Sequence, residues 1–545
     1  MKVMRGFAAA VLAGVAVLVA GCGGGSSSSG EGSLNTASLA PKDAGAWVSI
    51  DTDPGSAQWK SLDAILQKIP GAERQLDSPS SSPFEGAQLR TEVLPAIGPQ
   101  LVLVMPAAAS DPVMLVKPSD QGKLDALLAK TKGHEVTADV DGWTAIATSQ
   151  KALDAYQASL KDGTLADSDA FESATKGLPE DALALGYVNG KGLASGLGNL
   201  GGLGSVASLS GVAAGASGTS SLFRTTSSAS GSAPTATCTI TMNGKTHSCS
   251  ATTTRSCKIA ASGGTSCTSV TTTAGMGGLQ GVGVGSLPQK ATDLLRSAGF
   301  AVTVSNGTIH FEATLATPAG QTPEAYKPTL LDKVPSDALV AVSFHGGDSL
   351  SKQLASAGGA DALKQLEQQL GVSFDELAKA FEGEGVLYVR PGAPIPEITL
   401  AVTSQDPAAT KQVFDKVIAE LGGATSQGFS IPGFELTASI SDDTVVVSTS
   451  KAAASSFGSA PSLTSTDRFK SAAAAVDLGD TTSGFVYVDI HGLGPLLQAA
   501  LGALGGSSSS GSGDLLQALD AFDFVAVNAT AEDGQLRVEG ALKTE

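Results

Sequence analysis

Short segments of alternating apolar and polar residues recur along the chain, which is the pattern of half-buried β-strands. Residues 101–105 are followed by a second such segment at 113–117, and residues 135–140 by another at 143–148. Neighbouring strands joined by short turns must pair in the antiparallel sense. The pattern therefore predicts antiparallel sheet built from hairpins.

Helical periodicity appears between these strands. Asp406 and Pro407 have the residue types of an N-cap and a first helical turn, so they predict the start of a helix. Apolar residues recur at helical spacing after the first strand, at Trp59, Leu62, Leu66 and Ile69. We predict an α+β fold in which each antiparallel sheet carries helices packed on one face.

Several segments occur twice in the same order, at an offset of about 300 residues, which indicates internal duplication. The hairpin at residues 300–315 also corresponds to the one at 524–542, at a shorter offset because the first copy carries an insertion. The matching segments are residues 41–44 with 335–338, 147–152 with 448–452, 168–174 with 466–472, and 186–189 with 486–489.

The repeat predicts two tandem homologous halves, residues 39–317 and 330–545, joined by a Pro-bearing linker at 318–329. An insertion at about residues 196–286 interrupts the first half. It is rich in Gly, Ser and Thr and contains four cysteines.

The N-terminus has the layout of an export signal. Lys2 and Arg5 precede a short apolar run at residues 7–20, and Gly21 precedes Cys22. Small residues followed by cysteine resemble a bacterial lipobox, in which the cysteine receives a diacylglycerol and becomes the new N-terminus. An ordinary secretory signal with a chance cysteine is the alternative.

We therefore predict a lipoprotein signal peptide at residues 1–21, lipidation of Cys22 and a flexible Gly/Ser tether at residues 22–38. Two acyl chains provide a stable anchor, whereas one holds a protein only marginally. No later run of 18 or more apolar residues occurs. The expected location is outside the cytoplasm, on the bacterial cell membrane.

These features resemble those of actinobacterial predicted lipoproteins that carry the domain of unknown function 3352. The resemblance rests on the Val-Ala-Gly-Cys box, the Gly/Ser tether, the Pro-x-Asp-Ala strand at residues 41–50, and the following residues 51–54 and Trp59. It covers most of the chain apart from the insertion. The resemblance implies the anchor and the duplicated fold, and it implies no catalytic residue, because the family has no established activity.

Composition narrows the functional classes. The 545 residues are 42% hydrophobic, enough for two or three domains with sizeable cores. The net charge is −18 and the mature chain has no Lys/Arg cluster, which excludes the basic surface that nucleic-acid binding needs. The acidity is typical of a solvated surface.

Four cysteines remain after Cys22, and an even number in an exported chain favours two disulfides. Asn-Gly at residues 243–244 predicts a two-residue hairpin turn, which places Cys238 directly opposite Cys249. Cys257 then pairs with Cys267 by elimination. A zinc site is the competing interpretation, but no CxxC spacing occurs.

Other motifs have simpler explanations. Residues 196–201 match GxGxxG, but neither a helix nor an acid follows at the spacing of a dinucleotide site. Asp51 with Asp53, and Asp139 with Asp141, could each contribute to a calcium site, although turns account for both pairs. We predict no metal and no cofactor.

Catalytic signatures are also missing from the sequence, so we predict no catalytic residue. The chain has five histidines but no HExxH, and no serine lies in a GxSxG motif. His345 and His491 both end predicted strands and could converge, although solvated strand ends are the alternative. The Ser/Thr-rich stretches of the insertion are candidates for O-glycosylation.

The leading hypothesis is a non-catalytic, membrane-anchored binding protein with a groove for a hydrophobic ligand, such as a lipid or another envelope component. The alternative is a spacer or adhesion protein of the cell envelope. An enzyme on an unfamiliar scaffold is the third hypothesis. The sequence does not identify the ligand or the oligomeric state.

Overall fold

The chain divides into two compact units in the computed structural model, one formed by Gly204–Ser286 and the other by the residues on either side of it. The structure describes Phe84, Glu367 and residues 33–77, 87–107, 111–130, 135–190, 235–242, 245–259, 265–272, 296–317, 322–346, 371–392, 396–425, 435–503, 518–532 and 534–545.

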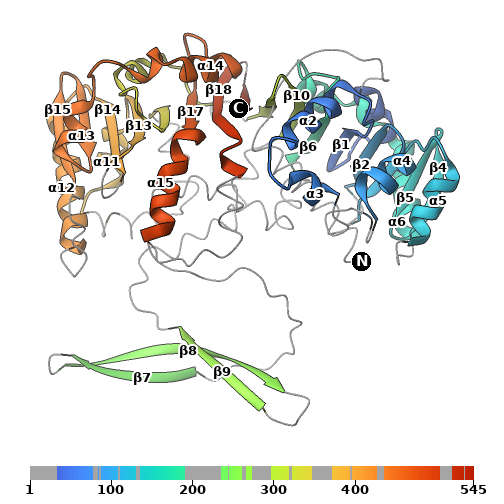
Figure 1. Cartoon of the computed structure of the whole chain (residues 1–545), viewed down its shortest axis with the longest axis horizontal. Helices are drawn as coiled ribbons and strands as arrows, with labels where there is room; N and C mark the ends of the chain where they lie inside the picture. The colour runs from blue at the N-terminus through green and yellow to red at the C-terminus, as the bar shows by residue number, and fades with distance from the viewer. Residues whose placement is uncertain are drawn as a thin grey trace. The chain divides into compact units, whose positions relative to one another are not determined.

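The larger unit contains one continuous antiparallel sheet of 16 strands (Figure 1). From one edge to the other, its strands are β15 (Thr437–Ser441), β16 (Thr444–Ser448), β14 (Glu397–Thr403), β13 (Glu384–Arg390), β12 (Val340–His345), β17 (Gly484–Asp489), β18 (Phe522–Glu532), β19 (Gln535–Thr544), β11 (Thr308–Ala316), β10 (Ser297–Ser305), β6 (Ala184–Asn189), β1 (Ala46–Asp51), β2 (Gln100–Met105), β3 (Val113–Val116), β5 (Trp143–Ala147) and β4 (Val136–Val140).

Helices lie between these strands in the sequence. The α-helices are α2 (Ala57–Leu66), α3 (Ala72–Leu76), α4 (Leu94–Ile97), α5 (Gln121–Lys130), α6 (Gln150–Ser159), α7 (Asp169–Thr175), α11 (Phe374–Ala380), α12 (Pro407–Thr425), α13 (Lys451–Ser456), α14 (Asp467–Ala475) and α15 (Ile490–Ala503). Shorter 3₁₀ or π turns are η1 (Ser33–Leu39), η2 (Leu89–Val93), η3 (Leu160–Asp162), η4 (Leu165–Asp167), η7 (Thr329–Lys333) and η8 (Leu463–Ser465).

The sheet is covered by helices on both faces, so the prediction of helices on one face was wrong. In β2, Leu101 and Leu103 pack with α2, α4 and α5, whereas Val102 and Val104 pack with α6 and α7. Successive side chains of a strand point to opposite faces, so these are two cores. The consecutive apolar residues of β2 are typical of a strand buried on both sides.

The strand order reads the same way from both edges. From one edge the order is β4-β5-β3-β2-β1-β6-β10-β11, and from the other it is β15-β16-β14-β13-β12-β17-β18-β19. Each series follows the chain through the same succession of hairpins and crossovers. The two series meet where β11 pairs with β19, so residues on both sides of the linker share one sheet.

A charged cluster lies at this junction. Glu312 of β11 is directly opposite Glu539 of β19, an arrangement that is destabilising for like charges. Arg537 compensates both acids: its Nη2 lies 2.8 Å from Glu312 Oε2, and its Nε lies 2.8 Å from Glu539 Oε1. Burial raises the pKa of Glu312, and Arg537 opposes that rise. Burial also lowers the pKa of nearby His310.

The smaller unit contains a three-stranded antiparallel sheet of β7 (Thr235–Met242), β8 (Lys245–Ile259) and β9 (Thr265–Thr272). Its register places Cys238 opposite Cys249 and Cys257 opposite Cys267. Cys22 and the GxGxxG segment at residues 196–201 lie outside the described residues. Within the described residues, no helix has both the length and the apolar character of a membrane span.

We expect Arg537→Leu to lower the free energy of unfolding by about 1–2 kcal/mol at neutral pH, because the half-exposed arginine separates two facing carboxylates. Since burial raises the pKa of Glu312, acid protonates this group readily and removes the repulsion. The deficit should therefore be largest above the folded-state pKa of Glu312 and shrink as the pH falls. Urea unfolding across the acidic range measures this dependence.

The control for this prediction adds Glu539→Gln to the Arg537→Leu chain. The second change removes one of the facing charges and should recover part of the lost stability at neutral pH. A deficit that is the same at every pH, or that the second change does not reduce, would contradict the electrostatic explanation.

Candidate functional site

The acidic pairs considered from the sequence belong to turns. Asp51 Oδ1 accepts a hydrogen bond from Asp53 N at 2.9 Å, and Asp53 Oδ1 accepts one from Gly55 N at 2.8 Å. Asp141 has a φ of 51° and Gly142 a φ of 79°, the left-handed conformation of a hairpin turn. In the described ranges, no group of three or more His, Cys, Asp or Glu residues is arranged to hold a metal.

The structure does not bring His345 and His491 together, so that hypothesis was wrong. His345 is the last residue of β12, whereas His491 lies two residues after the end of the antiparallel neighbour β17. Because these neighbouring strands are antiparallel, their C-terminal ends lie at opposite ends of the strand pair. His345 Nδ1 lies 2.7 Å from Gly346 O, and His491 Nδ1 lies 2.7 Å from Glu545 Oε1.

The polar side chains of greatest interest gather instead around β13, where the sequence analysis predicted no site. Glu384, Val386, Tyr388 and Arg390 occupy alternate positions of β13 and therefore share one face of the sheet. We call the polar residues on and around this face the β13 cluster: Tyr326, Thr329, Ser343, Glu384, Tyr388, Arg390, Glu397, Thr399, Ser448 and Ser456.

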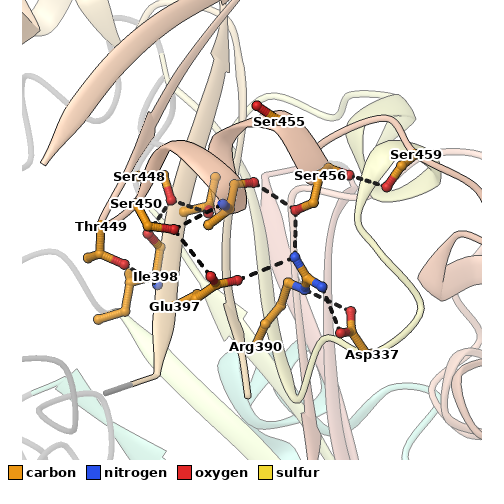
Figure 2. Close-up of polar contacts among 12 residues, drawn as sticks. Asp337, Arg390, Glu397, Ile398, Ser448, Thr449, Ser450, Ser455, Ser456 and Ser459 are labelled. Atoms are coloured by element: carbon orange, nitrogen blue, oxygen red, sulfur yellow. Dashed lines mark hydrogen bonds and ion pairs between the residues drawn. The ribbon is translucent and has the colours of Figure 1, made fainter. Parts of the chain in front are cut away.

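Arg390 organises one end of the cluster (Figure 2). Its Nε and Nη2 each donate to Asp337 at 2.7 Å, the bidentate geometry that suits guanidinium and carboxylate. Its Nη1 donates to Ser456 Oγ at 2.6 Å and lies 3.4 Å from Glu397 Oε2. Arg390 therefore ties β13 to β14 and to the end of α13.

The N-terminus of α13 is tied to the same network. Ser450 is its N-cap and accepts from Ala453 N at 3.0 Å, while the hydroxyl donates to Glu397 Oε1 at 3.2 Å. Glu397 is thus shared between Arg390 and the helix cap (Figure 2). The arginine's donors are occupied by the protein, so an anionic ligand would have to displace Asp337 or Glu397.

Glu384 organises the other end of the cluster. It is buried, and it accepts from Leu330 N and Thr329 Oγ1, each at 2.6 Å. Burial raises the pKa of Glu384 despite these donors. Nearby, Tyr326 Oη lies 2.8 Å from Ser343 Oγ. These contacts fasten the end of the predicted linker, residues 318–329, to strands β12 and β13.

A row of buried hydroxyls crosses the sheet between the two ends. Tyr388 is opposite Thr399, Thr399 is opposite Ser448, and Ser448 is opposite Thr437. The Thr399 and Ser448 hydroxyl oxygens are 2.9 Å apart. The hydroxyls of Tyr388 and Thr437 are buried and make no hydrogen bond in the described structure. Burial raises the pKa of Tyr388.

The fold does not require this polar row. The strands that occupy the same places at the other end of the sheet put Val104 opposite Val113 and Val136 opposite Ala147. Val104, Val113 and Ala147 are fully buried in an apolar core. Glu384, Tyr388 and Arg390 at alternate positions of β13, with Val386 among them, were the sequence pattern that could have revealed the cluster.

The chemistry of the cluster is that of a connecting network. Ser343 contacts a tyrosine hydroxyl, Arg390 contacts two acids and Glu384 contacts two donors. In these contacts the serine has no adjacent base to activate it as a nucleophile. The arrangement fixes the linker and α13 against the sheet.

Tyr388→Phe should leave the free energy of unfolding unchanged or raise it by up to about 1 kcal/mol, because it removes a buried hydroxyl without a hydrogen-bond partner. Tyr326→Phe is the matched control and should lower stability by about 1 kcal/mol, since its hydroxyl contacts Ser343. Chemical denaturation measures both. A loss of more than about 1 kcal/mol for Tyr388→Phe would show that this hydroxyl has a buried polar partner.

Comparisons of the chain with family models, with curated proteins and with solved structures found no match. The functional argument therefore depends on the geometry of the molecule itself.

Proposed function

We propose that this chain is a membrane-anchored lipoprotein of the cell envelope with a non-catalytic interaction role, built from two duplicated α+β halves. The identical strand order from both edges of the sheet supports the duplication. The duplication is also supported by similar aromatic contacts and similar helix caps on the two sides of the linker.

The ring packing is closely matched. Phe171 meets Tyr187 at a ring-centroid distance of 5.4 Å and an interplanar angle of 72°, and Phe469 meets Tyr487 at 5.3 Å and 63°. The helix that follows the β4–β5 hairpin and the one that follows the β15–β16 hairpin are capped alike. Ser149 accepts from Ala152 N at 3.2 Å, and Ser450 accepts from Ala453 N at 3.0 Å.

The observation that carries the interaction role is the presence of buried apolar clusters on both faces of the sheet. Helices and strands contribute to four clusters of buried apolar residues, two in each half. A carrier for a hydrophobic ligand would need an open groove between helix and sheet, and where these four clusters lie that space is occupied by the protein's own side chains. A rigid scaffold presenting polar surfaces fits this packing better than a lipid carrier does.

The proposed location at the membrane is inferred from the sequence. The Val-Ala-Gly-Cys box and the Gly/Ser tether favour a diacylglycerol on Cys22, as the resemblance to the predicted lipoproteins also implies. In this proposal the membrane is the first partner and another envelope component the second. Nucleic acid is excluded by the net charge of −18.

The same proposal includes two disulfides in the smaller unit. The register that sets Cys238 opposite Cys249 and Cys257 opposite Cys267 supports this pairing, because directly opposed residues of antiparallel strands have Cα spacings that a disulfide accepts. Two crosslinks would stabilise three strands that have little apolar sequence of their own.

We expect the full chain, expressed in an exporting bacterium, to fractionate with membranes, and a chain starting at residue 23 behind an ordinary cleavable signal to be soluble. Native mass spectrometry of the soluble form should give the protein mass less two hydrogens per disulfide. Peptide mapping without reduction should join Cys238 to Cys249 and Cys257 to Cys267.

Three outcomes would contradict parts of this proposal. A full chain that is released from membranes would rule out the lipid anchor. A co-purifying species of lipid mass, lost on denaturation, would replace the interaction role with a carrier function. Free thiols at the four cysteines would rule out the disulfides, and a bound metal would favour the zinc interpretation.

A further inference from the structure

The two edge strands of the large sheet differ in how they are protected. In the part of the chain that the structure describes, β4 pairs only with β5, and β15 pairs only with β16. The outer side of an edge strand presents unpaired N–H and C=O groups, which other chains can bind by strand addition. Soluble proteins commonly block such edges with charged side chains.

Edge strand β4 has this protection. Asp139 lies on β4, two residues before the turn residue Asp141, and it is exposed. At the corresponding place of β15, two residues before the turn residue Asp442, the chain has Ile440. The five residues of β15 carry no charge.

Ile440 is the only large hydrophobic side chain exposed among the described residues, at 45%. It pairs with the fully buried Val445 of β16 and therefore extends an apolar surface out to the sheet edge. An uncharged edge with an exposed isoleucine is a favourable template for another strand.

The backbone of β15 is oriented for such pairing. Ser441 and Thr444 flank the two-residue turn, so the hydrogen bonds to β16 fall at Ser441 and at every second residue before it. The amides and carbonyls of Ala438 and Ile440 consequently point away from the sheet. They offer two donors and two acceptors to an added strand.

Charge decides between a second copy of this chain and a different partner. An antiparallel pair of two β15 strands that overlapped along their whole length would place Asp443 of one copy opposite Glu435 of the other, and like charges directly opposite are destabilising. The net charge of −18 adds to the repulsion between copies. An added strand with basic ends would instead find Asp443 at one end of β15 and, at the other end, Glu435, whose carboxylate also lies 3.2 Å from Lys451 Nζ.

We propose that β15 is a strand-addition site for an extended segment of another protein, with an apolar residue that packs on Ile440 and Lys or Arg at its ends. This inference rests on the proposed interaction role and names its surface and the chemistry of its partner. The proposed function and this inference can be contradicted independently, because membrane fractionation and mass spectrometry, which test the former, do not depend on β15.

The test uses the exported chain that starts at residue 23 and three labelled synthetic peptides. The first is Lys-Thr-Val-Thr-Val-Thr-Lys, the second has Glu at both ends, and the third has Pro in place of the second Val, which removes a ladder donor. Fluorescence anisotropy should show that the basic peptide binds at least about tenfold more tightly than either control peptide. Hydrogen exchange should show new protection of the Ala438 and Ile440 amides when the basic peptide binds.

Two variants localise the binding. Ile440→Asp gives β15 the residue that protects β4 and should weaken binding of the basic peptide at least about tenfold. Asp139→Ile is the reciprocal control and should create a second binding site on β4. Both positions are exposed, so thermal unfolding of each variant should match that of the parent chain.

Several results would overturn the proposal. If the basic peptide binds the Ile440→Asp variant as tightly as the parent chain, β15 is not the binding site. If the acidic peptide binds as tightly as the basic one, the charge argument is wrong. Protection of the Ala438 and Ile440 amides in the free protein would mean that the edge is already covered. A dimer that sedimentation detects in the parent chain and not in Ile440→Asp would make a second copy the occupant.

Discussion

The pairing of β11 with β19 is the contact on which the organisation of the larger unit depends. Without it, the chain would have two eight-stranded sheets, each with an open edge at its last hairpin. The pairing removes both edges at once and joins the residues before the linker to those after it. Its register puts Glu312 opposite Glu539, so the junction needs the cation that Arg537 provides.

The origin of that charge problem is the symmetry of the arrangement. Glu312 is six residues after the turn residue Asn306, and Glu539 is six residues after Asp533, so residues at equivalent places of the two hairpins face each other. Any charged residue at the centre of such a contact meets its own counterpart. Arg537 breaks the symmetry. It lies four residues after Asp533, and the residue four places after Asn306 in the other hairpin is His310. Two hairpins of one chain can differ in this way, whereas the hairpins of two identical chains cannot.

The sequence contained most of the fold but little of the polar cluster. Alternation and turn residues predicted the hairpins, and the Asn-Gly turn predicted the register that opposes Cys238 and Cys249. The prediction that helices cover only one face of the sheet was wrong. The apolar run at residues 101–104 was interpreted as an alternation of apolar and polar residues, whereas it is a strand buried on both sides. The β13 cluster depends on which distant strands become neighbours, and residues such as Glu384 and Thr329 meet only through that topology.

Divergence between the two ends of the sheet is where function is best sought. Where the strand order is the same, common features such as the Ser149 and Ser450 helix caps maintain the fold. Differences between the two ends are not needed to maintain the fold. A row of hydroxyls lies beneath α13 where the other end of the sheet has valines, and Ile440 lies where that end has the protective Asp139. The hydroxyl row is buried and acts on the protein itself, whereas Ile440 lies on the surface, on a strand whose outer side pairs with no other strand among the described residues. Only the second difference can be detected by another molecule, and for that reason the β15 edge is the stronger candidate for recognition.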